Sequence, residues 1–282
     1  MELTQNVNNM LNLQKTLFYI ALVFLSLLIN SCKEQKENNP PKKKIDTISV
    51  VKETGPKILP DSLLKLHLLG KCDYKYDTCF ILVPPQYCYR KIYLQKETCQ
   101  KFIEMHEAAK KDSISIIISS GARNFYDQKS IWDRKWRKVK RKLKKDTSNL
   151  NIENKKIALE ILLKCAMPST SRHHWGTDID IFYQSGNEYF DTLEGKKQYH
   201  WMKKNAHKFG FHQVYTDKNK TQRSGYEEEK WHWSYIPIAN KYTKKYAQLI
   251  SYDDIKDFKG SDLAKEIKAI EHYVYGINKK FK

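Results

Sequence analysis

The sequence predicts an α+β fold, in which helices are segregated from a small, central antiparallel sheet. Long segments place apolar residues at helical spacing, whereas the β-rich or alternating runs are short. No internal repeat is present. With 282 residues, of which 40% are hydrophobic, the chain can form one sizeable core and still keep a processed or flexible leader.

The N-terminus resembles a bacterial lipoprotein signal. An apolar run extends from Leu17 to Ile29, follows Lys15 and ends shortly before Cys32. This run is short for a membrane span, and its flanks fit a positively charged start and a small-residue cleavage site. We therefore expect residues 1–31 to be removed and Cys32 to be lipidated. The protein would then be anchored to a membrane of the cell envelope, facing the periplasm or the exterior. The alternative is an uncleaved anchor or a buried N-terminal helix.

The remaining chain is expected to have three parts. Residues 32–60 are polar and predict a flexible tether. Residues 61–252 hold the periodic segments and form the predicted main domain, and residues 253–282 form a basic C-terminal extension. The net charge of +19 predicts an anionic partner. Nucleic acid is the usual partner of such a charge, but an exported chain meets anionic polysaccharide, lipid head groups and cell-wall carboxylates instead.

Two helices open the main domain. Segment 61–70 starts at Asp61, a favourable N-cap, and ends at Gly70. Segment 94–112 carries a stripe at helical spacing, so its histidine is predicted to be a core residue. The stripe consists of Cys99, Phe102, Ile103, His106 and Ala109. The next run, 113–120, is β-rich and predicts a buried strand.

Segment 131–145 predicts an amphipathic helix with a strongly basic outer face. Its apolar positions Trp132, Trp136, Val139 and Leu143 recur at helical spacing, and nine of the twelve residues 134–145 are Lys or Arg. The simple interpretation is a solvated face. The alternative is a docking surface for anionic envelope polymers or a membrane.

The rest of the domain alternates between helices and short strands. Further helices are predicted over 151–165, 194–209 and 239–250. Further strands are predicted at DIDIFY (178–183), FHQVY (211–215) and WHWSYI (231–236). Cys165, in the first of these helices, is expected to be a small buried apolar residue.

Four cysteines, Cys72, Cys79, Cys88 and Cys99, lie within 28 residues. Export makes disulfides possible, and the sequence does not choose among the three connectivities. A zinc site built from them is the rival interpretation, which the absence of a Cys-x-x-Cys pair disfavours.

Two clusters contain the residues for catalysis. The first places His173 and Asp180 seven positions apart, and the second places Glu229 three positions before His232. Three ligands of His, Asp and His type leave zinc an open position for water, as hydrolytic zinc sites require. A carboxylate that is not a ligand must accept the proton from that water, and Glu229 is the candidate.

Strand geometry constrains this arrangement. On a regular strand Asp178, Asp180 and Phe182 point to one face, so Asp178 could support the metal ligands from beside them. Glu229 cannot share the face of His232 on a regular strand, and we expect it in the bend that leads into the strand.

The pattern Ser-x-His-x-x-Gly-x-x-x-Asp, followed downstream by Glu-x-Trp-His, resembles the zinc D-alanyl-D-alanine carboxypeptidase and dipeptidase family. This family includes vancomycin-resistance enzymes and is structurally related to Hedgehog domains. Its Ser-Gly-x-Arg element with a later Gln is matched by Ser120 to Arg123 and Gln128. A departure is Asp178, where the family usually has a small residue.

The resemblance implies a role for each matching residue. His173, Asp180 and His232 would bind one Zn²⁺ per chain, with Glu229 as general base. Arg123 would face the carbonyl oxygen or terminal carboxylate of the substrate, and Ser171 and Gln128 would help to bind the peptide. His174 is expected to point away from the metal, and no role is assigned to His67, His200, His207, His212 or His272.

The activity implied is hydrolysis of D-alanyl-D-alanine bonds in peptidoglycan stem peptides. An L,D-carboxypeptidase or endopeptidase acting on the same polymer is the nearest alternative. A non-catalytic, wall-binding lipoprotein that keeps zinc for structure is another, although the presence of Glu229 argues for turnover. A nucleic-acid binder is disfavoured by the export signal.

Overall fold

The structure is a computed structural model and describes residues 60–146, 153–182 and 186–281. The predicted signal peptide, Cys32 and the tether up to residue 59 lie outside the described residues. Among the described helices none is both long and apolar enough to cross a membrane.

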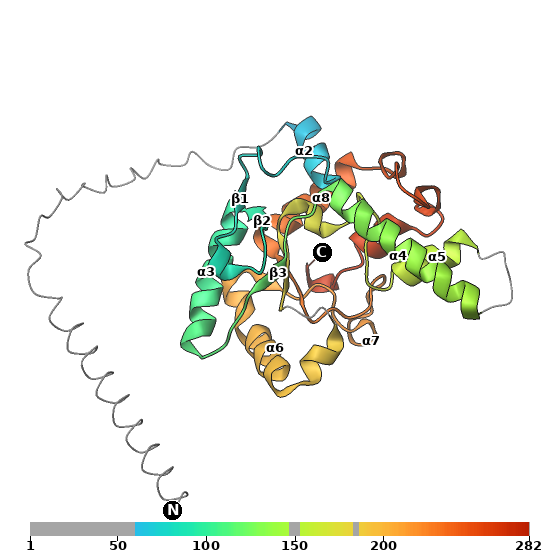
Figure 1. Ribbon diagram of the computed structural model, residues 1–282. Helices are drawn as coiled ribbons and strands as arrows, with labels where there is room; N and C mark the ends of the chain where they lie inside the picture. The colour runs from blue at the N-terminus through green and yellow to red at the C-terminus, as the bar shows by residue number, and fades with distance from the viewer. Residues whose placement is uncertain (1–59, 147–152, 183–185, 282) are drawn as a thin grey trace, which may run out of the picture. The chain divides into compact units, whose positions relative to one another are not determined.

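The architecture combines helices with two small antiparallel sheets, which confirms the predicted α+β class (Figure 1). The helices are α2 (Asp61–Leu68), α3 (Lys96–Lys111), α4 (Phe125–Asp146), α5 (Asn154–Ile161), α6 (Leu193–Asn205), α7 (Lys218–Thr221) and α8 (Ile236–Leu249). The strands are β1 (Phe80–Leu82), β2 (Tyr93–Gln95), β3 (Ile118–Ser120), β4 (Asp178–Ile181), β5 (Phe211–His212) and β6 (His232–Tyr235).

The larger sheet has the strand order β3-β4-β6-β5, with every neighbouring pair antiparallel. Strands β4 and β6 lie at its centre, and their register pairs Asp178 with Ser234 and Asp180 with His232. On its other side Asp180 pairs with Ser120 of β3. The register therefore brings together three motifs that lie far apart in the sequence.

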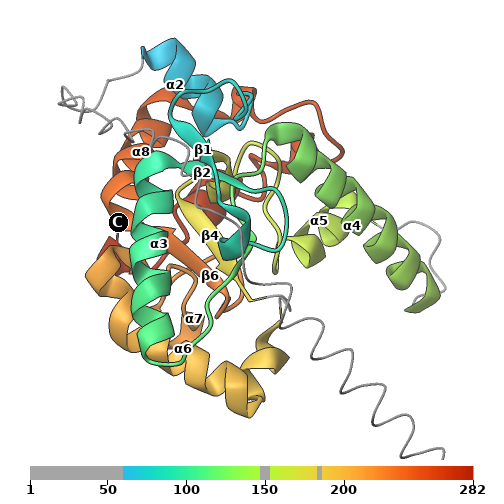
Figure 2. The same ribbon diagram turned by 60° about the vertical axis from the view of Figure 1, so that its left-hand side comes forward.

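One face of this sheet is apolar and packs against α3 and α6 (Figure 2). The sheet residues in this core include Ile118, Ile179, Ile181, Phe211, Trp233 and Tyr235; the helical ones include Phe102, Met105, Trp201 and Met202. Phe182 joins the same core, so the expectation that it shares the face of Asp178 and Asp180 is wrong. The strand ends at Ile181, and Phe182 has a φ of 73°, which turns its side chain to the other side.

A second core contains α2, α4, α5, α8 and the chain beyond residue 252. Its members include Leu64, Leu68, Trp132, Trp136, Ile161, Tyr246, Ile255, Phe258, Ile267 and Val274. The indole nitrogen of Trp132 donates to the carbonyl oxygen of Lys259 at 2.8 Å. The segment expected as a basic extension is thus part of this core in the described residues 253–281.

Helix α4 starts six residues earlier than the sequence pattern indicated. Asn124 and Asp127 form a reciprocal cap: the Asn124 side chain accepts from the Asp127 amide at 2.8 Å, and the Asp127 carboxylate accepts from the Asn124 amide at 3.3 Å. This satisfies amides that a helix start leaves unpaired. Conversely, the predicted strands 113–120 and 211–215 shrink to β3 and β5, because only those residues pair in the sheet.

The five described cysteines are free thiols. The disulfides that the sequence allowed among Cys72, Cys79, Cys88 and Cys99 are therefore not formed in the structure. Cys165 is buried, as predicted.

Candidate active site

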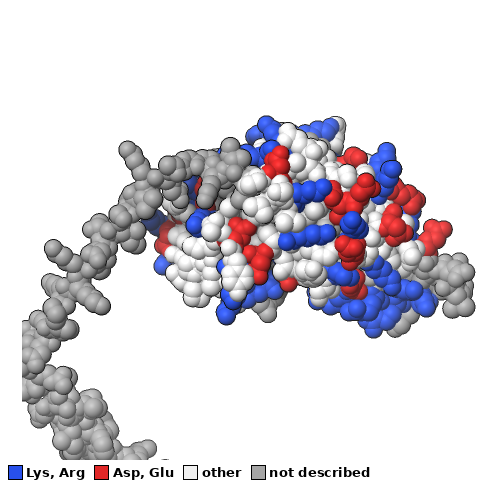
Figure 3. Space-filling model, turned by 90° about the horizontal axis from the view of Figure 1, so that it is seen from above, with Lys and Arg blue, Asp and Glu red and all other residues white. Residues whose placement is uncertain are grey.

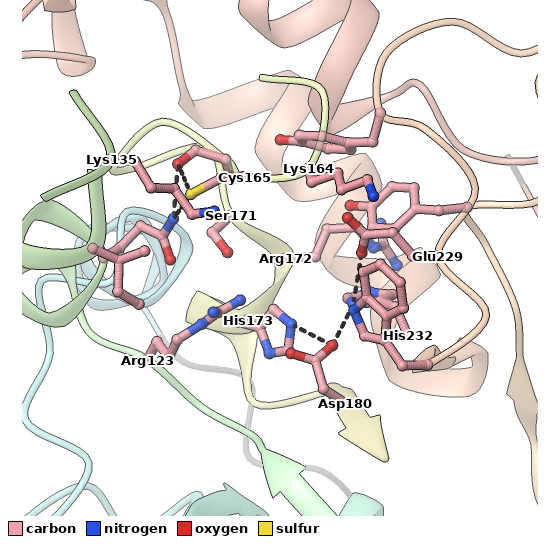
Figure 4. Close-up of a pocket in the computed structure, with 16 residues that line it drawn as sticks. Arg123, Lys135, Lys164, Cys165, Ser171, Arg172, His173, Asp180, Glu229 and His232 are labelled. Carbon is pink, nitrogen blue, oxygen red and sulfur yellow. Dashed lines mark hydrogen bonds and ion pairs between the residues drawn. The ribbon is translucent and has the colours of Figure 1, made fainter. Parts of the chain in front are cut away.

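His173, Asp180 and His232 converge on one point, as Figure 4 shows. Nε2 of His173 lies 3.3 Å from Oδ1 of Asp180, and Nδ1 of His232 lies 3.1 Å from the same oxygen. One donor atom from each residue lies within 4.8 Å of the others. Two nitrogens and one carboxylate oxygen at this spacing can hold a metal ion.

A short 3₁₀ helix, η2 (Arg172–Trp175), places His173 beside the sheet. It ends at Gly176, whose φ of 67° turns the chain into β4. A Cβ atom at Gly176 would lie 2.3 Å from Cε1 of Phe80, so only glycine fits this turn. The spacing between His173 and Asp180 is thus set by a tight turn between a helix and a strand.

Each imidazole of the cluster is oriented through its other nitrogen. Nδ1 of His173 donates to the carbonyl oxygen of Gly121 at 2.8 Å, which leaves Nε2 facing Asp180. Nε2 of His232 donates to Asp178 at 3.0 Å, which leaves Nδ1 facing Asp180. Metal-binding histidines are held in this way.

Asp178 is itself held by a buried guanidinium. Nε of Arg172 lies 3.1 Å from Oδ1 of Asp178, and both side chains are fully buried. Thr177 donates to Oδ2 at 2.6 Å, and Arg172 also donates to Ser234 at 2.9 Å. Burial alone would raise the pKa of Asp178, but Arg172 and His232 outweigh it and hold that pKa well below its usual range. The sequence did not single out Arg172, although a buried Asp178 requires a cationic partner.

Glu229 lies in the turn before β6, where the strand geometry predicted it. Its Oε2 is 3.9 Å from Nδ1 of His232, and its side chain is almost completely buried. The amide of Glu229 donates to the carbonyl oxygen of Tyr215, whose ring packs in a tilted arrangement against His232 with 4.6 Å between centroids. Burial raises the pKa of Glu229 to about 7, although the charge of His232 opposes this. A carboxylate with this pKa is suited to accept and return a proton near neutral pH.

The predicted substrate-binding residues Arg123, Gln128 and Ser171 line the same cavity, which has a volume of about 210 Å³. Arg123 lies across the cavity from Glu229 (Figure 4), and its buried Nε atom has no hydrogen-bond partner among the described residues. Gln128 donates to the carbonyl oxygen of Ala166 at 2.7 Å, while its own side-chain oxygen is likewise unpaired within the described chain. The cavity thus presents unused polar atoms opposite the candidate ligands.

Lys135 and Lys164 also line the cavity and were not predicted to do so. Lys135 belongs to the basic helix, where it lies on the inner rather than the outer face. That position could have identified it as a residue of the cavity. In Figure 4 Lys135 lies on the side of Arg123, whereas Lys164 lies on the side of Glu229, so cationic side chains line both sides of the cavity.

His174 is not among the converging residues, as expected, but for a different reason. It lies in η2 rather than on an extended segment, and both of its ring nitrogens are used. Nε2 accepts from the amide of Ser169 at 3.0 Å, and Nδ1 donates to the carbonyl oxygen of Arg123 at 2.6 Å. Burial lowers the pKa of His174 to about 3, so the ring is neutral. The hydroxyl of Tyr74 donates to the same Arg123 carbonyl at 2.8 Å, and these two side chains fix the Arg123 backbone.

A family model described as VanY, D-alanyl-D-alanine carboxypeptidase, matches residues 91–238. This range includes every candidate ligand, Glu229 and the residues that line the opposite wall.

Individual proteins show the same likeness. A D-alanyl-D-alanine carboxypeptidase of Enterococcus faecalis is 30% identical over 149 residues, which are 51% of this chain and 48% of that protein. The chain spans about half the length of the curated relatives it matches, between 48% and 53% for three of them.

Two solved structures are similar over part of the chain. VanYB in complex with D-alanine-D-alanine is 26% identical, with a TM-score of 0.45 over 62% of this chain and 85% of that chain. A mutant of the vancomycin resistance D,D-pentapeptidase VanY in complex with Zn(II) is 23% identical, with a TM-score of 0.43 over 62% of this chain and 94% of that one.

Proposed function

Because the chain belongs to the VanY family of D-alanyl-D-alanine carboxypeptidases, we propose that it hydrolyses the terminal D-alanyl-D-alanine bond of peptidoglycan stem peptides. One observation supports this most directly. A single cavity holds the cluster of His173, Asp180 and His232, the buried carboxylate of Glu229 and the guanidinium of Arg123, whose Nε atom has no partner among the described residues. The three candidate ligands and Glu229 supply the groups that hydrolysis of an amide bond needs. The positive charge of Arg123 suits a substrate with a free carboxyl terminus.

The cluster fits one zinc ion. Two imidazole nitrogens and one carboxylate are the ligands found in hydrolytic zinc sites, which leave a further position open. Burial opposes ionisation of Asp180, but the two imidazoles outweigh it and hold the pKa of Asp180 well below its usual range. When bound, zinc acidifies a water molecule and polarises the peptide carbonyl group.

The chain's own residues carry the proton and position the substrate. Glu229 accepts the proton of the attacking water and returns it to the nitrogen of the departing D-alanine, so no covalent enzyme intermediate is needed. Arg123 pairs with the terminal carboxylate, for which its fork of donors is suited. Ser171 and Gln128 have side chains in the cavity that can hydrogen-bond the peptide.

The basic face of α4 provides a second contact with the envelope in this proposal. Arg137, Lys140, Arg141 and Lys144 line a shallow hollow on the surface. Figure 3 shows Lys and Arg side chains gathered on one part of the surface, at the lower right of the view. Such a face attracts anionic polymers of the envelope in a salt-dependent manner.

Anchoring through Cys32 would place the protein at the envelope. The apolar run Leu17–Ile29 and the polar sequence after Cys32 support a lipid-anchored location facing the periplasm or the exterior. The peptidoglycan substrate is found in that compartment.

Purified muropeptides of defined length test the proposed reaction. The full chain is incubated with stem peptides that end in D-alanyl-D-alanine, with and without a chelator, and the products are identified by mass. Loss of one terminal D-alanine that stops with the chelator is expected. Cleavage of an internal bond, or of an L,D bond only, would contradict the proposal.

A further inference from the structure

The geometry points to a second metal site, formed by His67, Cys72 and Asp77, for a thiophilic divalent cation such as Zn²⁺. One donor atom of each of these residues lies within 4.8 Å of the others. Nε2 of His67 contacts Oδ2 of Asp77 directly. None of these residues lines the catalytic cavity, so the cluster is separate from the site described above.

The donors are held in place by the surrounding structure. His67 lies in the last turn of α2 and is 4% exposed, with its ring 5.7 Å from the ring of Phe80. Oδ1 of Asp77 accepts from the amide of Cys79 at 2.9 Å, which directs Oδ2 towards His67. A carboxylate oriented by a backbone amide resembles the supported ligands of metal sites.

One ring nitrogen of His67 makes no hydrogen bond within the described residues. This atom, Nδ1, is buried. Buried polar atoms are nearly always paired, and an exception calls for a missing water or ion. An imidazole, a thiol and a carboxylate whose donor atoms lie this close together form a set that can hold a cation. Imidazole, thiolate and carboxylate are all zinc ligands.

The cluster closes a loop that supports the catalytic cavity. Residues 69–79 connect α2 to β1, and the cluster joins Cys72 and Asp77 of this loop to His67 of α2. Tyr74, inside the loop, donates to the carbonyl oxygens of Arg123 at 2.8 Å and His174 at 3.0 Å. Gly70 accepts from the amide of Phe125 at 2.7 Å, which ties the loop to the start of α4. A bound cation would therefore stiffen the loop that holds the Arg123 backbone.

Cobalt substitution tests this site separately from the first one. The first site contains only nitrogen and oxygen donors, whereas the second includes the Cys72 thiolate. Thiolate-to-cobalt charge transfer gives a near-ultraviolet absorption band that imidazole and carboxylate ligands do not give. The full chain, kept reduced with a reductant that contains no thiol, is titrated with Co²⁺. The band is expected in wild type and in the matched control Cys88→Ser, whose cysteine lies outside the cluster.

Cys72→Ser should lose the band and one equivalent of zinc by elemental analysis, while zinc at the first site remains. Asp77→Asn provides a second variant, with reduced band intensity expected, should Cys72→Ser fold poorly by circular dichroism. A wild-type protein without the band would overturn the proposal, as would a band that persists in Cys72→Ser. A Cys72–Cys79 disulfide in the protein isolated without reductant, detected by peptide mass, would also overturn it. Peptide hydrolysis is not a readout here, so these outcomes are independent of the proposed function.

Discussion

Nε2 of His232 lies 3.0 Å from Oδ1 of Asp178, and both side chains are almost completely buried. The contact orients His232 so that its other nitrogen faces Asp180. Burial lowers the pKa of His232, but the bonds to Asp178 and Asp180 more than compensate and raise it to about 9. Ion pairs thus link Arg172 to Asp178 and Asp178 to His232, and His232 in turn faces Asp180.

Asp178→Ala should weaken zinc binding roughly 10- to 100-fold, because His232 loses the partner that fixes its orientation. The variant should also lose about 3–5 kcal/mol of unfolding free energy, because the buried guanidinium of Arg172 is left unpaired. Competition with a chelating dye measures the first effect, and denaturant unfolding measures the second.

The double variant Arg172→Met with Asp178→Ala separates the two effects. Removing both charges should restore much of the stability but not the zinc affinity. Unchanged zinc affinity in either variant would show that Asp178 does not position His232.

Glu229→Gln should keep zinc and lose most hydrolysis, by roughly 10²- to 10⁴-fold in kcat, because the amide cannot accept the proton of the attacking water. His173→Ala, in contrast, should lose metal and activity together. The measurement is zinc content beside steady-state turnover of a muropeptide. Full activity in Glu229→Gln would rule out the proposed proton transfer.

The pH dependence of kcat/KM should show an acid limb set by Glu229. Burial raises the pKa of Glu229 to about 7, and a nearby bound cation acts in the opposite direction. Only the ionised carboxylate accepts a proton, so activity is lost as pH falls from about 7 towards the ordinary range of a glutamate. A pH–rate profile in wild type tests this, with zinc content measured at each pH. A rate that stays constant down to the ordinary range of a glutamate would contradict the assignment.

Arg123→Ala should lower kcat/KM for a free stem peptide by roughly 10- to 100-fold, the effect of a lost charged hydrogen bond. A C-terminally amidated peptide should be a poor substrate of wild type and should lose little more in the variant. Arg137→Ala, on the outer face of α4, is the matched control and should leave both rates unchanged. Equal turnover of free and amidated peptides by wild type would favour an endopeptidase.

Cys32→Ser should release the protein from the membrane fraction without changing its activity on a soluble muropeptide. The lipid attached to Cys32 is the expected anchor, and the variant removes its attachment point. Cell fractionation with detection of the chain measures this. A Cys32→Ser protein that remains in membranes would indicate an uncleaved anchor.

The sequence predicted the convergence of the three candidate ligands better than it predicted their surroundings. His173, Asp180 and His232 could be paired from motif spacing and strand periodicity, because both are local properties. The contact between Asp178 and Arg172 could not, since it depends on the tight turn at Gly176 that places η2 beside β4. Phe182 was misplaced because nothing local indicates that a phenylalanine will adopt a positive φ.

The cysteines show the same limit. Their spacing suggested disulfides, and a metal site was disfavoured because no Cys-x-x-Cys pair occurs. Cys72 in fact lies beside His67 of α2, a residue to which the sequence gave no role. The fold of residues 60–80 around Phe80 brings Cys72 and His67 together. No characteristic sequence spacing signals such a contact.

The contribution of residues beyond 252 to the core has a consequence for folding. Leu64 and Leu68, near the start of the domain, share one core with Ile255, Ile267 and Val274 near its end. These contacts join segments from opposite ends of the domain, and long-range closure of this kind is slow during folding. A chain cut after residue 252 would lose Ile255, Ile267 and Val274 from the core and would leave Leu64 and Leu68 with fewer packing partners.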